Sequence, residues 1–126
     1  MLQMKTRHWE MVKNILGKYP HRFYVYGSRV KGNAKKFSDL GLCFQEKIPW
    51  NVLGHIQEDF EESNLPFKVD LVNWEWMSAD FKKLIKDGLT PIDELFQNYI
   101  YKIFLVYIRD KEIIIKYILI NFLLYY

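Results

Sequence analysis

Two apolar runs joined by a basic loop are the feature that most constrains how this chain can fold. Residues 22–26 are mainly aromatic and β-branched and lead into Gly27-Ser28, whereas residues 40–44 are apolar and follow Asp39 directly. Both runs predict short strands. Glycine permits a sharp turn and the close approach of a phosphate, and Ser28 offers a hydroxyl and an N–H. The stretch therefore predicts a phosphate-binding turn beside a carboxylate.

The loop between these runs is rich in cations, at Arg29, Lys31, Lys35 and Lys36. Such side chains can supply countercharge to a polyphosphate. An ordinary turn followed by a solvated basic face has the same composition, so these residues alone leave both interpretations open. The cations cluster around a turn, and the loop offers neither a helix of the size that enters a DNA groove nor aromatic residues on which bases could stack. Nucleic-acid binding is therefore not favoured.

A second carboxylate stands in the third apolar run, residues 67–72, where Asp70 shares one strand face with Lys68. Asp39 and Asp70 come together only if the second and third strands are neighbours, which we expect. Paired carboxylates suit Mg²⁺, which takes one or two protein carboxylates together with water and phosphate oxygens. The plainer alternatives are a helix-cap or turn residue at position 39 and a solvent-facing edge-strand residue at position 70.

Helical spacing of apolar residues predicts three helices around these strands. They cover residues 6–18 with Thr6 as N-cap, residues 50–63, and residues 78–86 with Ser78 as N-cap. His8 and His21 flank the first helix and are expected to be ordinary surface or capping residues. This order of elements predicts an α/β (α+β) fold, a small mixed β-sheet with helices packed on it.

The composition fits one folded domain of 126 residues with a net charge of +3 and a single cysteine, Cys43. That cysteine lies in an apolar strand run, which indicates a buried thiol and a reducing compartment. Charged and bulky residues fill the N-terminus where a leader peptide would be apolar, so we expect a cytoplasmic protein. We divide the chain into a folded domain, 1–92, and an apolar, helical tail, 93–126, which is too interrupted to favour a membrane span.

The run from Gly27-Ser28 through ten residues to Asp39-Leu40-Gly41-Leu42, with Asp70 on a later strand, resembles the minimal nucleotidyltransferases of the DNA polymerase beta superfamily. Their signature is Gly-Ser, ten residues, Asp-x-Asp, and a third carboxylate on a following strand. The segment 28–40 is similar to that of small bacterial antitoxins paired with HEPN-domain toxins. The resemblance covers about residues 5 to 92 and omits the tail.

This resemblance implies a nucleotidyltransferase fold and the transfer of AMP from ATP to a tyrosine of a HEPN partner, with Mg²⁺ as cofactor. It assigns the phosphates to Gly27 and Ser28, and the basic character of the loop adds Arg29 and Lys31 as expected phosphate-binding residues. It assigns catalysis and metal binding to Asp39 and Asp70.

Position 41 departs from the family pattern because it holds glycine where the second carboxylate is expected. Residues 39 and 41 of a strand point to the same face, so an aspartate at 41 would share the metals with Asp39. We expect an antitoxin-like protein that binds its partner while its transfer activity is weakened or lost. A fully active adenylyltransferase and a decayed reading frame without a selected function are the alternatives.

Overall fold

The computed structural model describes residues 2–107 and 111–125. The contacts within the chain define two units, and the boundary between them along the sequence falls between Ile92 and Asp93. In the first unit the helices are α1 (Thr6–Leu16), α2 (Ser28–Lys31), α3 (Trp50–Glu61) and α4 (Ala79–Ile85). Its strands are β1 (Tyr24–Tyr26), β2 (Leu40–Phe44), β3 (Val69–Asn73) and β4 (Thr90–Pro91). Single 3₁₀ turns cover Trp74–Trp76 and Lys86–Gly88. This mixed arrangement is the α/β class that the sequence predicts.

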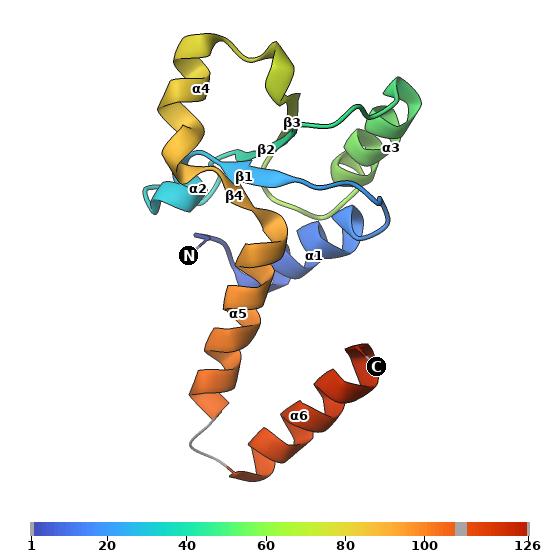
Figure 1. Ribbon diagram of the computed structural model, residues 1–126, viewed down its shortest axis with the longest axis vertical. Helices are drawn as coiled ribbons and strands as arrows, with labels where there is room; N and C mark the ends of the chain where they lie inside the picture. The colour runs from blue at the N-terminus through green and yellow to red at the C-terminus, as the bar shows by residue number, and fades with distance from the viewer. Residues whose placement is uncertain (1, 108–110, 126) are drawn as a thin grey trace. The chain divides into compact units, whose positions relative to one another are not determined.

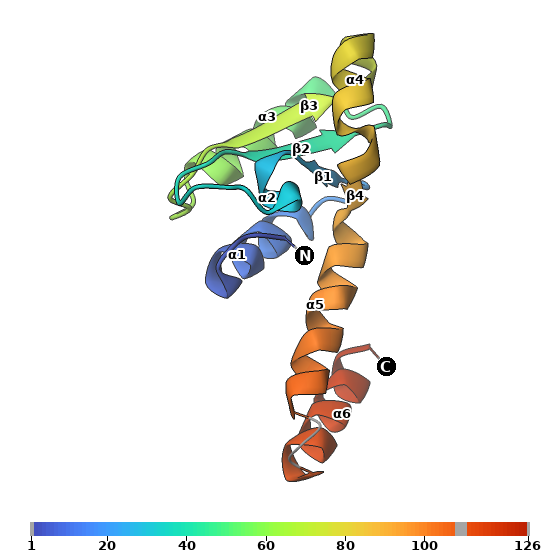
Figure 2. The ribbon, with the colours of Figure 1, turned by 90° about the vertical axis from the view of Figure 1, so that its left-hand side faces the viewer.

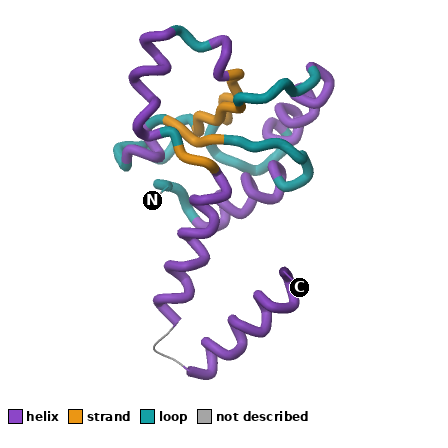
Figure 3. Tube along the Cα trace, in the orientation of Figure 1, coloured by secondary structure: helices purple, strands orange, loops and turns teal. Residues whose placement is uncertain are grey.

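The four strands form one sheet in the order β3-β2-β1-β4. The β2 strand pairs in parallel with β3 and antiparallel with β1, and β1 pairs antiparallel with β4. The expected adjacency of the second and third strands is therefore confirmed. Strands occupy the centre of this unit, and helices and loops surround them (Figure 3).

The core lies on the face of the sheet that carries Val25, Leu40, Leu42 and Phe44, all of which are buried. Alternation along a strand places these residues together. Helices α1 and α3 contact each other and bury apolar side chains at Trp9, Val12, Leu16, Ile56 and Phe60. Helix α4 lies on the side of the sheet opposite α1, as Figures 1 and 2 show.

The start of α1 differs from the sequence prediction in two respects. Lys5, and not Thr6, occupies the N-cap position, and no side chain caps the helix. His8, expected at the surface, is only 8% exposed because its ring packs edge-on against Phe67 at 5.8 Å between centroids. The prediction at Ser78 is confirmed, since its side chain accepts a hydrogen bond from the N–H of Phe81.

The second unit contains α5 (Ile92–Tyr107), apart from its first residue, and all of α6 (Lys111–Tyr125). Within it, the Tyr117 hydroxyl donates a hydrogen bond of 3.2 Å to the carbonyl of Ile100, and the Tyr117 ring contacts Phe104. Several large apolar side chains of α6 are exposed, at Ile115, Ile118, Leu119, Ile120, Phe122, Leu123 and Leu124. Among the described residues, no helix combines the length and the apolar character needed to cross a bilayer.

Candidate functional site: a Gly-Ser turn beside a row of sheet residues

The Gly-Ser turn joins β1 to the short helix α2. From the sequence, the residues of α2 were expected to belong to a loop. Gly27 has φ 97°, a backbone conformation that side-chain-bearing residues avoid, although a Cβ there would meet nothing within 4 Å. Its carbonyl accepts hydrogen bonds from the N–H groups of Val30 and Lys31. Among the described residues, none accepts a bond from the N–H or hydroxyl of Ser28. Both donors are therefore available to a ligand at the turn.

Arg29 was expected to bind phosphates, but the structure places it elsewhere. Its side chain is only 5% exposed, and the guanidinium donates to the carbonyls of Ser38 at 2.7 and 3.0 Å, Gln3 at 2.9 Å and Lys36 at 3.3 Å. The guanidinium carbon also lies 4.0 Å from the centre of the Phe67 ring. Arg29 therefore holds the basic loop against the N-terminal segment, and Lys31, which is exposed on α2, is the cation that remains near the turn.

One row across the sheet brings together Tyr26, Gly41 and Asp70. Tyr26 is paired with Gly41 in the antiparallel ladder, and Gly41 is paired with Asp70 in the parallel ladder. Paired residues in adjacent strands face the same side of a sheet. Asp39, two residues before Gly41, belongs to this face by alternation. The residues that the family pattern singles out thus share one surface with a tyrosine that the sequence analysis did not consider.

The Tyr26 ring covers Gly41. A Cβ built at position 41 would lie 2.7 Å from Cε2 and 2.8 Å from Cζ of Tyr26, and 2.9 Å from its carbonyl oxygen. The ring is held in place by an edge-on contact with Phe81 of α4. Burial and then the charge of Asp70 raise the pKa of the Tyr26 hydroxyl, so this group stays protonated and neutral near pH 7. A neutral phenol thus lies over the position where the family pattern has a carboxylate.

The two carboxylates flank this row. Asp39 is exposed and precedes β2 directly, and its charge opposes the lowering effect of burial on the pKa of Arg29. Lys68 Nζ lies 3.2 Å from Asp70 Oδ1, so a cation already meets this carboxylate. Within the described part of the chain, no three His, Cys, Asp or Glu side chains gather as a metal site would require. Two carboxylates on one face suit a single Mg²⁺ that also takes phosphate oxygens as ligands. They do not suit a site for two metal ions, which would need a third carboxylate shared between the metals.

Cys43 also lies on the site face of β2, two residues beyond Gly41. The thiol is free and buried, as the sequence predicts, and burial raises its pKa to about 11. A thiol with such a pKa is protonated at neutral pH and is a poor nucleophile or metal ligand. Cys43 therefore belongs to the packing of the sheet and not to its chemistry.

The fold agrees with the comparison to known families. Residues 10–98 match the family described as polymerase beta, nucleotidyltransferase. This chain belongs to that family, and its four-stranded mixed sheet with packed helices is consistent with the nucleotidyltransferase fold. Over 97 residues it is 38% identical to a protein of Haemophilus influenzae named "Probable protein adenylyltransferase MntA", a match that covers 74% of this chain and 85% of the relative.

Sequence reasoning missed Tyr26 as part of this site. The only signal was a large aromatic residue directly before Gly27, which is equally typical of a buried strand. The pairing of Tyr26 with Gly41 depends on the register between β1 and β2, and that register follows from the whole loop between them. A large residue opposite a glycine becomes informative only once the register is known.

Proposed function

We propose that this chain is an antitoxin-like nucleotide-binding protein that pairs with a HEPN-domain toxin and transfers AMP from ATP weakly or not at all. The observation that carries this proposal is the Tyr26 ring over Gly41. Nucleotidyl transfer depends on the placement of metal ions and on neutralisation of phosphate charge. Position 41, where the family pattern has the second carboxylate, is a glycine in this chain, and the Tyr26 ring fills the space beside it.

The intact part of the site supports nucleotide binding. No described residue accepts a hydrogen bond from the N–H or the hydroxyl of Ser28, Gly27 provides the positive φ of the turn, and Lys31 is exposed on α2. These groups can hold the phosphates of a nucleoside triphosphate. Asp39 and Asp70 would hold a Mg²⁺ ion, which supplies charge neutralisation to the phosphates when it is bound. Lys68 would have to move away from Asp70 for this.

The protein partner and the location belong to the same proposal. The Haemophilus influenzae relative is named as a protein adenylyltransferase, which supports a protein as the molecule that this site meets. The resemblance of residues 28–40 to antitoxins supports a HEPN-domain toxin as that partner. The reduced, buried Cys43 suits the cytoplasm.

Replacing Ser28 by Ala is expected to weaken binding of Mg²⁺-ATP about tenfold, because a hydrogen bond to a charged phosphate is lost. Isothermal titration calorimetry on the full chain measures this effect. Ser63→Ala, at the end of α3, removes a hydroxyl that donates to the carbonyl of Phe60 and lies in another part of the sequence, so it serves as the matched control. Equal affinities in wild type and Ser28→Ala would show that the turn does not hold the phosphates.

A further inference from the structure

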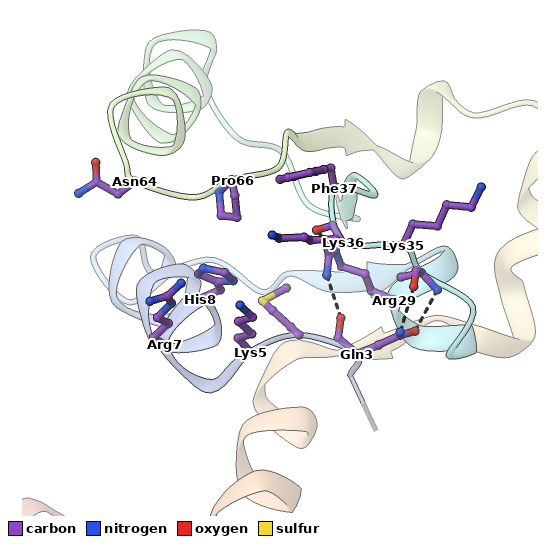
Figure 4. Close-up of a pocket in the computed structure, with 12 residues that line it drawn as sticks. Gln3, Lys5, Arg7, His8, Arg29, Lys35, Lys36, Phe37, Asn64 and Pro66 are labelled. Carbon is purple, nitrogen blue, oxygen red and sulfur yellow. Dashed lines mark hydrogen bonds between the residues drawn. The ribbon is translucent and has the colours of Figure 1, made fainter.

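A basic pocket lies beside the start of α1, apart from the turn that carries Ser28. It has a volume of about 600 Å³, is partly open to solvent, and lies between the N-terminal segment, the basic loop before β2 and the loop before β3 (Figure 4). Its lining includes Lys5, Arg7, Lys35 and Lys36 but none of Gly27, Ser28, Asp39 or Asp70. A pocket of this size accommodates a compact small molecule.

The charge of this pocket is uncompensated. No Asp or Glu of the described residues lines it, and none of its four lysine and arginine side chains named above forms an ion pair with a described residue. The first turn of α1 has no acidic residue and no side-chain cap, although cations are unfavourable at the positive end of a helix. Like charges gathered in this way repel one another, and a bound anion would relieve that repulsion.

A second, independent feature is His8, which lines the pocket and is only 8% exposed. Its imidazole has no hydrogen bond to any residue that the structure describes, and its ring nitrogens still reach solvent although most of the side chain is covered, so they can meet a ligand in the pocket. Burial, followed by the charges of Arg7, Lys5 and Arg29, lowers its pKa. Near pH 7 the ring is neutral and offers one N–H donor to a ligand.

The pocket is also built in advance of any ligand. The Gln3 side chain clamps the loop, because its amide donates to the carbonyl of Ala34 and accepts from the Ala34 N–H, each at 2.9 Å. Arg29, which also lines the pocket, ties the same two segments together through bonds to the carbonyls of Gln3 and Ser38. Phe37, 63% exposed, and Pro66 lie at its rim, where Lys36 Nζ is 5.3 Å from the Phe37 ring centre (Figure 4).

From these features we infer that this pocket is a second anion site, one that takes a compact small molecule bearing several phosphate groups. Among the described residues, several cations without an acidic partner, a helix start without a side-chain cap and a largely buried histidine without a hydrogen bond match the charge and the acceptor oxygens of such a ligand. The pocket is a half-open hollow bounded by three segments of the chain, which favours a small molecule over a nucleic-acid strand, since a strand needs a groove that follows its backbone.

The test is a titration of the full-length protein with inorganic tripolyphosphate at physiological ionic strength without Mg²⁺, followed by NMR signals of the His8 ring. Binding is expected to raise the pKa of His8, because the polyanion opposes the surrounding cations. The double variant Lys5→Gln/Lys36→Gln is expected to weaken binding at least about tenfold, since two charged contacts are removed. Lys83→Gln/Lys86→Gln removes the same charge from exposed positions at α4 and its following turn and should leave the affinity within about twofold.

Three results would overturn the inference. The control pair could weaken binding as much as the pocket pair, which would mean non-specific attraction by net charge. Ser28→Ala could abolish binding, which would place the phosphates at the turn and not in the pocket. A single-stranded oligonucleotide could bind at least about tenfold more tightly than tripolyphosphate and lose this affinity in the pocket pair, which would make the surface a nucleic-acid site.

Discussion

Gly41→Asp alone is expected to destabilise the protein and to leave nucleotidyl transfer no faster than in wild type. The new Cβ would meet two ring atoms of Tyr26 and the Tyr26 carbonyl oxygen within 2.9 Å. The ring can rotate away, but the carbonyl belongs to the ladder between β1 and β2 and can shift only by distorting it. Overpacking of this kind costs about 1–3 kcal/mol. Urea unfolding followed by circular dichroism measures the loss.

Two further variants separate the loss of stability caused by the added Cβ from any effect of the new charge at position 41. Gly41→Ala introduces the same Cβ without a carboxylate and is expected to lose nearly as much stability as Gly41→Asp. In a double-mutant cycle with Tyr26→Ala, the loss caused by position 41 should shrink by at least about 0.5 kcal/mol, because the ring contacts disappear. If the costs at positions 26 and 41 simply add, Tyr26 does not occupy the space beside Gly41.

Arg29→Met is expected to be the most destabilising single substitution near the site. Methionine keeps much of the apolar length of arginine but leaves the carbonyls of Gln3, Lys36 and Ser38 without their donor. Hydrogen bonds from charged donors contribute about 1.5–3 kcal/mol each, so we expect a net loss of about 3 kcal/mol. That loss corresponds to a fall in Tm of about 10 °C or more for a chain of this size, which differential scanning calorimetry measures.

Lys31→Met is the matched control for this prediction, because it removes a cation from the same helix at an exposed position. Its effect on stability should stay within about 0.5 kcal/mol. If Arg29→Met lowers Tm no more than Lys31→Met does, the guanidinium is not what holds the loop to the N-terminal segment. Arg29 would then again be a candidate for phosphate binding.

The sheet could be predicted from the sequence because its strands are short apolar runs bounded by turn residues. The bounds of β2 are those expected, since residues 40–44 are buried on both faces and follow a polar segment. Two elements could not be foreseen. The helix α2 spans only Ser28–Lys31, too few residues for a periodic pattern, and β4 is the pair Thr90–Pro91, whose pairing depends on β1.

The site was only partly predictable for a related reason. Composition identifies a basic loop, but burial decides which cations can face a ligand, and burial is a property of the folded chain. Arg29 and Lys31 are alike in charge, yet Arg29 is buried among carbonyls and Lys31 is exposed. Likewise, Gly41 is visible in the sequence as a missing carboxylate, whereas the ring that covers it belongs to another strand.

The measurement that tests the central claim most directly is AMP transfer from labelled ATP to a HEPN-domain partner in the presence of Mg²⁺. Wild type is compared with Tyr26→Ala/Gly41→Asp and with Tyr26→Ala/Gly41→Asn, an almost isosteric control that lacks the charged ligand. We predict little or no transfer by wild type and the control, and a rate at least on the order of a hundredfold higher with the aspartate. If wild type transfers AMP as fast as Tyr26→Ala/Gly41→Asp does, the account is contradicted.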